Sequence, residues 1–344
     1  MDYPGYMQPR FTFIDLFAGI GGLRIPFENI PGLPGKCLLT SEKDASARRT
    51  YAENFREKDS EGHTENHDVT TLSLGDVPRH DLLLAGFPCQ PFSHAGKRLG
   101  FEDMRGTLFF HIMAIVEGLA AGGKALQNAP RVVLLENVRG LKGHDGGRTL
   151  RRITEELSRF YVVTTQLLDA RDFGLPQSRQ RLFIIGIRKD LSEAEKFRSI
   201  LDDALERHKS LRSQIQVGDI LEADVPERYM ISDLLWASHQ ARKKKHEERG
   251  NGFGYRLVTG NSTHTATLSA RYYKDGSEIL VSDPRFGNPR KLTPREAANL
   301  QGFPRDFKIP VSDTQAYKQF GNAVPVRVIE FLAAVVTPYL VGDN

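Results

Sequence analysis

The chain has 344 residues, of which 40% are hydrophobic and 26% charged, so its composition is that of a globular protein and not of a disordered one. No apolar run approaches the roughly 20 residues that cross a bilayer, and residues 1–10 lack the apolar core of a signal peptide. The net charge of +4 is too small to indicate a polyanionic partner by itself. At roughly 150 residues per domain, the length suggests about two domains in a soluble protein.

The two cysteines, Cys37 and Cys89, cannot form a disulfide scaffold, and neither has the spacing of a zinc ligand. The ten histidines are scattered along the chain, so no metal site is expected.

The first part of the chain alternates short apolar runs with amphipathic stretches. The runs have the length and composition of buried parallel strands: Phe11 to Phe17, Cys37 to Ser41, Asp81 to Phe87, Arg131 to Glu136, Tyr161 to Leu168 and Arg181 to Ile187. The stretches between them are helical candidates: Ala45 to Phe55, Thr107 to Ala121 and Arg148 to Phe160. This alternation predicts an α/β fold with a doubly wound, mostly parallel sheet, whose ligands bind at the carboxyl ends of the strands.

After about Lys189 this rhythm stops. Leu191 to Arg212 has a helical pattern, residues 249–254 are rich in glycine, and Lys274 to Ser277 is a hairpin pattern between two strand-like runs. The final amphipathic helix, Val326 to Leu340, is expected to pack on the first sheet. We therefore predict a catalytic domain at 1–190 that is completed by 318–344, and a smaller domain of β and irregular structure at 191–317.

Closely spaced glycines follow the first predicted strand, in Asp15 to Gly22. Glycines there let a ligand approach the backbone, and Glu42, 23 residues after Gly19, could bind ribose hydroxyls. The spacing is not G-x-G-x-x-G, so it suits an adenosyl ligand without phosphates better than a dinucleotide. A purely structural tight turn is the alternative.

Cys89 lies between two prolines, in Gly86 to Ser93, directly after a predicted buried strand. A thiolate held in such a rigid loop would be a positioned nucleophile, although a lone cysteine is often an inert buried residue. Cys37 falls inside a predicted strand and is expected to be inert.

Glu136 ends the next predicted strand, where a partly desolvated carboxyl can deliver a proton near neutral pH. Arg179 and Arg181 take alternate positions at the start of the following strand. Such a pair suits an anion or a base carbonyl, and a solvent-facing charge pair is the alternative.

From His239 to Arg256 there are six basic residues against two acidic ones, a local excess of +4. A local excess of this kind favours a polyanion, with a solvated helix face as the alternative.

Six motifs in this order resemble those of the DNA cytosine-5 methyltransferase family: Asp15 to Gly19, Pro88 to Gln90, Glu136 to Val138, Gln177 to Arg181, Leu292 to Glu296 and Gly321 to Pro325. The resemblance runs from Phe13 to about Pro325 and is loosest between Lys189 and Lys291. It implies that Cys89 attacks carbon 6 of a cytosine while Glu136 protonates nitrogen 3, that Arg181 holds the base carbonyl, and that Arg179 lies close by. The target base would have to leave the duplex stack.

The same resemblance implies S-adenosylmethionine as cofactor, S-adenosylhomocysteine as product, and no metal. It assigns the cofactor to Phe17, Gly19, Gly21, Gly22, Glu42, Asp68, Pro88, Asn322 and Val324. Some members have an aromatic residue next to the ribose acid, where this chain has Lys43.

Residues 249–255 and 267–276 resemble the recognition segment of methylases that act on CC(A/T)GG or related CCNGG sites. Double-stranded DNA is the partner that this implies, contacted by Gln90, Ser93, Arg242, Lys243, Lys244, Arg256, Thr267 and Arg271. The resemblance also implies a monomer in the nucleoid-containing cytoplasm of a prokaryotic cell, paired with a restriction endonuclease.

Three alternatives remain at this point. A tRNA cytosine-5 methyltransferase could use the same motifs, and a catalytically silent DNA-binding regulator could share the fold, although Cys89 and Glu136 both being present argues against it. A nicotinamide oxidoreductase is disfavoured by the missing G-x-G-x-x-G spacing.

Overall fold

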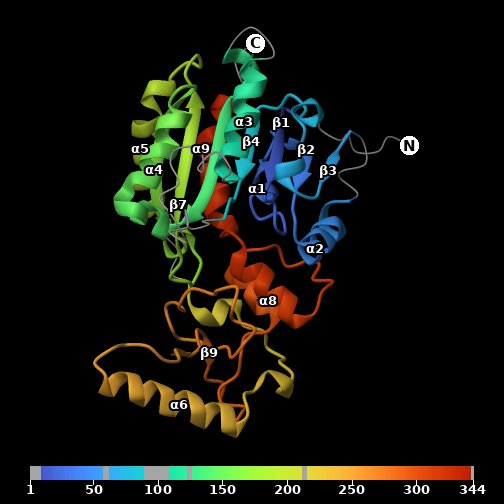
Figure 1. Cartoon of the computed structure of the whole chain (residues 1–344). Helices are drawn as coiled ribbons and strands as arrows, with labels where there is room; N and C mark the ends of the chain where they lie inside the picture. The colour runs from blue at the N-terminus through green and yellow to red at the C-terminus, as the bar shows by residue number, and fades with distance from the viewer. Residues whose placement is uncertain (1–8, 57–61, 89–107, 122–125, 211–214, 342–344) are drawn as a thin grey trace, which may run out of the picture. The chain divides into compact units, whose positions relative to one another are not determined.

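The computed structural model describes residues 9–56, 62–88, 108–121, 126–210 and 215–341 (Figure 1). The chain divides into two compact units. The first consists of Met1–Leu168, Gln180–Ser210 and Ile329–Asn344, and the second of Asp169–Arg179 and Leu211–Val328. Each unit is therefore built from segments that are not contiguous in sequence. The domain boundaries expected at residues 190 and 318 stay a prediction.

The first unit contains a seven-stranded sheet with the order β3-β2-β1-β4-β5-β7-β6. Its strands are β1 Phe11–Leu16, β2 Gly35–Ser41, β3 Thr64–Asn66, β4 Leu82–Ala85, β5 Val132–Val138, β6 Tyr161–Asp169 and β7 Gln180–Arg188. The pairings from β3 to β5 are parallel, whereas β7 runs antiparallel to β5. The predicted α/β fold with a mostly parallel sheet is confirmed, and each of the six predicted runs contains a strand.

Helices cover both faces of this sheet, as its buried strands require. They are α1 Arg24–Glu28, α2 Ala45–Phe55, α3 Leu108–Ala121, α4 Arg148–Leu157, α5 Phe197–Ser210 and, from Ile329 onward, α9 Val326–Leu340. The alternation within β1 shows the layering. Ile14 and Leu16 join a core cluster with residues of α3 and α4, whereas Phe13 packs on Phe27 of α1 with ring centroids 6.3 Å apart.

Helix α9 packs on the first unit as predicted. Arg131, next to β5, donates to the carbonyl of Tyr339, and the Tyr339 ring lies 5.6 Å from that of Phe197. Among the described residues, one helical stretch, Asp313–Leu340, is long and apolar enough to cross a membrane, but 67% of its most apolar window is buried inside the protein. Length and composition alone are therefore weak evidence for a span, because a core helix passes the same test.

The second unit has little regular structure. Its helices are α6 Asp233–Glu248, α7 Pro294–Leu300 and α8 Asp313–Asn322, and its two short strands, β8 Leu257–Val258 and β9 Leu280–Val281, pair in parallel. The hairpin predicted at 274–277 is wrong. The turn itself forms, with Gly276 at φ 67°, but the buried Tyr272 holds the chain instead: its hydroxyl donates to the carbonyl of Ile279 and accepts from the amide of Leu292.

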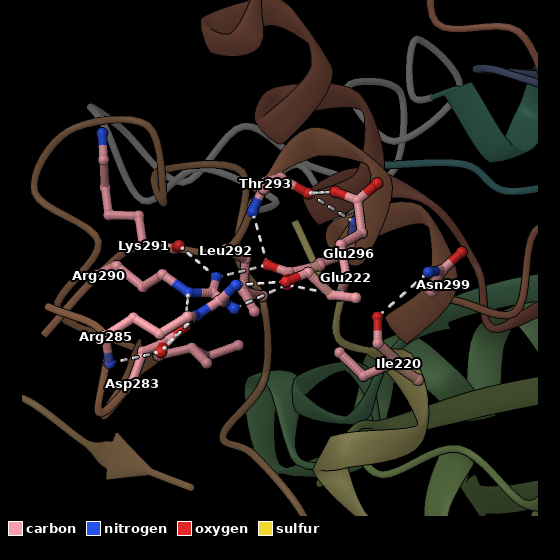
Figure 2. A network of polar contacts seen from close by, with 12 residues as sticks. Ile220, Glu222, Asp283, Arg285, Arg290, Lys291, Leu292, Thr293, Glu296 and Asn299 are labelled. Carbon is pink, nitrogen blue, oxygen red and sulfur yellow. Dashed lines mark hydrogen bonds and ion pairs between the residues drawn. The ribbon is translucent and has the colours of Figure 1, made fainter. Parts of the chain in front are cut away.

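A buried network of charged groups fixes the middle of this unit (Figure 2). Both carboxylate oxygens of Glu296 receive the guanidinium of Arg290, at 2.8 and 2.9 Å. The same oxygens accept the amides of Thr293 and Glu222, at 2.8 and 2.9 Å. Glu296 thus caps α7 and ties three separate segments together.

Candidate cofactor and catalytic site

The glycine loop after β1 has left-handed backbone at Phe17, Gly19 and Gly21, with φ of 57°, 57° and 84°. A Cβ on Gly19 would meet nothing within 4 Å, whereas one on Gly21 would lie 2.3 Å from the ring of Phe55. The two glycines therefore differ: Gly19 leaves open space beside the backbone, and Gly21 lets the loop pack on α2. A left-handed conformation at a bulky residue such as Phe17 is strained and is typical of functional sites.

Glu42, directly after β2, faces this loop. Its Oε2 accepts the amide of Gly19 at 2.8 Å, and its Oε1 accepts the amide of Asp44 at 2.7 Å. A carboxylate oxygen has more than one acceptor position, so both oxygens can accept further hydrogen bonds. The carboxylate is thereby fixed in a position from which it can bind a pair of ribose hydroxyls.

Asp68 lies at the start of a short 3₁₀ turn, η1 Val69–Thr71, which it caps through the amide of Thr70. Its Oδ2 also receives the ammonium of Lys43 at 2.7 Å. Hydrogen bonds from Lys43 and Thr70 lower the pKa of Asp68 to about 2, so it is ionised at neutral pH. Lys43, which stands where some family members have an aromatic residue, is therefore paired with Asp68, the acid expected to bind adenine.

The loop after β4 is held by the next strand. The side-chain amide of Asn137 donates to the carbonyl of Phe87 at 2.9 Å, and both residues are buried. Phe87 is followed by the exposed Pro88. No role was expected for Asn137, although it lies within the motif Glu136 to Val138. Cys89, Gln90 and Ser93 lie outside the described residues.

Glu136 precedes Asn137 on β5 and pairs with Arg181 on β7, with Oε1 2.9 Å from Nε. Their side chains are only 10% and 13% exposed. Oε2 of Glu136 lies 3.7 Å from the position that a Cβ on Gly86 would take, so the carboxylate faces the loop that leads to Cys89. Burial lowers the pKa of Arg181, but a guanidinium stays protonated at neutral pH.

Arg179 belongs to the second unit and is fully buried. Its guanidinium donates to the carbonyls of Leu268, Gly321 and Ala323, at 2.8, 2.9 and 2.6 Å. The alternative of a solvent-facing arginine pair is therefore wrong for Arg179 and for Arg181. Arg179 thereby stabilises the backbone on either side of Asn322. Asn322 itself is exposed, whereas Val324 is buried.

Asp15 is a buried acid that the sequence placed only within the glycine motif. It is fully buried, and neither carboxylate oxygen has a hydrogen-bond partner among the residues that the structure describes. Burial raises the pKa of Asp15 to about 8, against the opposing effect of the nearby Arg24. Asp15 is therefore mostly protonated at neutral pH.

These residues fit an adenosyl group. The open space at Gly19, the fixed Glu42 and the ionised Asp68 would meet the methionine part, the ribose and the adenine in that order. Within the described part of the chain, no group of three or more histidine, cysteine or acidic side chains could hold a metal ion.

The other residues expected to contact DNA belong to the second unit and have several different environments. Lys244, Arg256 and Arg271 are exposed, Arg242 pairs with Asp275 at 3.1 Å, and the ammonium of Lys243 lies 4.7 Å from the centre of the Tyr255 ring. The hydroxyl of Thr267 donates to the carbonyl of Ser178 and so connects backbone segments.

The model of the C-5 cytosine-specific DNA methylase family matches residues 11–337. The type II methyltransferase M.DsaV of Dactylococcopsis salina is 50% identical over 334 residues, covering 97% of this chain and 88% of that protein. M.NlaX of Neisseria lactamica is 49% identical over 324 residues, covering 94% and 95%. The crystal structure of the S. pombe Dnmt2 methyltransferase shares the fold, with a TM-score of 0.73 at 19% identity over 95% of this chain and 98% of that one.

Proposed function

The chain belongs to the family of C-5 cytosine-specific DNA methylases, and from this premise we propose how its residues perform the reaction. The protein is a DNA cytosine-5 methyltransferase similar to the type II enzymes of restriction–modification systems. The proposal concerns the covalent route, the residues that carry it and the DNA target.

Cys89 is the nucleophile. Its thiolate forms a bond to carbon 6 of the cytosine, and the ring electrons move to nitrogen 3, which takes a proton from Glu136. Carbon 5 of the resulting enamine then takes the methyl group. Loss of the carbon 5 proton to solvent expels the thiolate, and nitrogen 3 returns its proton to Glu136, which restores the neutral ring and the acid. Arg181 binds the base carbonyl beside Glu136.

One observation carries this assignment. Consecutive residues of β5 serve both reacting groups: Glu136 points Oε2 toward the loop after β4, and Asn137 holds that loop at Phe87, two residues before Cys89. The proton donor and the residue that anchors Phe87 are thus neighbours on one strand. Because Arg181 engages Oε1, the carboxyl is oriented toward the loop without side-chain rotation.

S-adenosylmethionine supplies an electrophilic methyl group when it is bound. Glu42 takes the ribose hydroxyls, Asp68 takes the adenine amino group, and Phe17, Gly19, Gly21, Gly22 and Pro88 form the wall beside the methionine part. Asn322 and Val324 are proposed to complete this pocket. The product is S-adenosylhomocysteine, and no metal takes part.

The substrate is a specific duplex sequence of the CCWGG or CCNGG type, from which the target cytosine is flipped out of the stack. Modification would protect the DNA of a prokaryotic cell from a cognate restriction endonuclease, with the methyltransferase acting as a monomer. The similarity to type II methyltransferases, which extends over nearly the whole chain, supports the proposed pairing with a restriction endonuclease. No observation on the described residues favours tRNA as substrate.

A duplex with 5-fluorocytosine at the target position tests the covalent route, because fluorine cannot leave as the proton does. We expect a complex that survives denaturation with the wild type and none with Cys89→Ser, since a serine hydroxyl is a far weaker nucleophile at neutral pH. An active wild type that forms no adduct would contradict the route. Bisulfite sequencing of plasmid DNA after expression identifies the target, and methyl transfer to tRNA but not to duplex DNA would overturn the substrate.

A further inference from the structure

The glycine-rich loop after α6, residues 249–256, folds back along that helix. The amides of Gly250 and Asn251 donate to the carbonyls of Glu247 and His246, at 2.9 and 3.1 Å. Farther along, the ring of Tyr255 packs against that of Trp236 on α6, with centroids 4.7 Å apart. Both ends of the loop are therefore attached to the helix.

Gly254 fixes the middle of the loop. Its φ is 150°, and a Cβ there would lie 2.9 Å from Cγ of Lys243 on α6. Only glycine allows the backbone to come this close to the helix. The backbone of the loop is thus held against α6 at Gly254, directly after Phe253.

Phe253 projects from this fixed loop. Its side chain is 71% exposed, although the edge of its ring rests on His246, with centroids 5.7 Å apart. The neighbours in sequence, Gly252 and Gly254, have no side chains that could cover it. Planar groups can therefore approach the phenyl ring with little steric hindrance from its flanking residues.

Four cations share this part of the unit: Lys244, Lys245, Arg249 and Arg256 are exposed and form no ion pair within the described part of the chain. Cations of this kind attract phosphates. An exposed aromatic ring near such cations in sequence is the combination by which proteins stack on nucleic acid bases, or wedge between them.

We propose that Phe253 inserts its ring into the base stack of the target duplex, with Lys244, Lys245, Arg249 and Arg256 on phosphates of the same duplex. This rests on the proposed DNA substrate. The rigid attachment of the loop lowers the entropy lost on insertion, because Phe253 is presented without rearrangement of the backbone.

The full-length protein and three variants test the proposal: Phe253→Ala, Phe253→Trp and Leu234→Ala. Leu234 is the matched control, because it is 83% exposed on α6 but lies outside the loop. Affinity is measured on the cognate duplex at several salt concentrations, and 2-aminopurine placed at each position of the site reports unstacking.

We expect Phe253→Ala to bind about 10-fold more weakly, which corresponds to the stacking of one base. The salt slope should be unchanged because no charge is removed. At one position the wild type should raise 2-aminopurine fluorescence, and Phe253→Ala should remove that rise. Phe253→Trp should retain both properties, and Leu234→Ala should match the wild type, while all variants keep the wild-type melting temperature.

Two outcomes would overturn the insertion of Phe253 and leave the proposed function intact. One is a Phe253→Ala variant that binds and unstacks like an otherwise active wild type. The other is a Phe253→Ala variant that still raises 2-aminopurine fluorescence and whose loss of affinity relative to the wild type disappears when thymine is replaced by uracil. This result would indicate a groove contact to the thymine methyl group. A wild type that neither binds nor methylates duplex DNA would overturn the proposed function and this inference together.

Discussion

Two buried arginine–glutamate pairs, one in each unit, have similar chemistry and different surroundings. Arg290 and Glu296 are 1% and 0% exposed and are joined by two hydrogen bonds, with two backbone amides on the same carboxylate (Figure 2). Arg181 and Glu136 meet through Nε and Oε1 and are 13% and 10% exposed. The first pair is enclosed by the protein, and the second keeps an accessible edge.

The two pairs therefore suit different roles, a structural one for Arg290 and Glu296 and the proposed catalytic one for Arg181 and Glu136. Burying an ion pair costs desolvation free energy, which close contacts and additional hydrogen bonds offset. Glu296 has these bonds and holds three segments in place. At the second pair, where we propose that the target base binds, both side chains keep a small exposed fraction. The same substitution should therefore have different consequences in the two pairs.

Glu136→Gln should lower the turnover number by about 10²- to 10⁴-fold, because an amide cannot deliver the proton to nitrogen 3. The melting temperature should stay close to that of the wild type. Transfer of labelled methyl groups to the cognate duplex measures the first quantity and thermal unfolding the second. Wild-type turnover in this variant would remove Glu136 from the mechanism.

Glu296→Gln should instead reduce stability, by about 1–3 kcal/mol, because it removes one of the two carboxylates that the buried Arg290 contacts and leaves Asp283 as the other. Urea unfolding measures this, and DNA binding should be lost together with the fold of the second unit. Glu248→Gln, at an exposed position near the end of α6, is the matched control and should be neutral. Equal stability of the two variants would mean that the network does not hold the unit.

Asp15 extends the comparison to a buried acid that has no hydrogen-bond partner within the described part of the chain. Its pKa is raised from the ordinary value of 3.8 to about 8 in the folded chain. Burial and the negative charges of Glu42 and Glu28 raise this pKa, and together they outweigh the opposing effect of Arg24. The folded state therefore favours the protonated form. The resulting stability is fully present below about pH 4 and is lost as the pH rises through about 8.

Asp15→Asn should flatten this decline. We expect the free energy of unfolding of the variant to exceed that of the wild type by a few kcal/mol at pH 8.5 and to match it near pH 4, since about 1.4 kcal/mol accompanies each unit of pKa difference. Urea titrations of the cofactor-free protein at both pH values measure it. A wild type whose stability rises over this range would show that Asp15 is ionised in the fold.

The smallest effect is expected at the exposed pair of Lys43 and Asp68. Lys43→Ala releases a carboxylate that we propose binds the adenine amino group, so cofactor affinity should rise by up to about fivefold, the range of one exposed ion pair. Calorimetric titration with S-adenosylhomocysteine measures it. Weaker binding would indicate that the Lys43 side chain covers the adenine instead.

The sequence predicted what depends on local pattern. Buried strands such as β5 were visible as apolar runs, but β3 was missed because Thr64, Glu65 and Asn66 are polar residues at the sheet edge. The hairpin failed because Tyr272 forms hydrogen bonds with Ile279 and Leu292, and such tertiary contacts leave no mark in turn propensity.

The candidate site shows the same limit. Glu136 and Arg181 could be placed from strand ends. The environment of Arg179 could not, because its acceptors are backbone carbonyls some 90 to 140 residues distant, which any residue type provides. Lys43 drew attention as an unusual residue, but its pairing with Asp68 required the structure.

The segment Asp169–Arg179 is separated in sequence from the rest of the second unit, yet it supplies part of that unit's interior. Gln177 bonds the amide of Leu268 and the carbonyl of Leu300, and Arg179 bonds three further carbonyls. In a chimaera that exchanges only residues 211–328 with another methylase, the original Gln177 and Arg179 would have to pack against a foreign sequence. Transplanting sequence preference between such enzymes therefore requires a two-piece graft, with the eleven residues before β7 moved along with the larger insert.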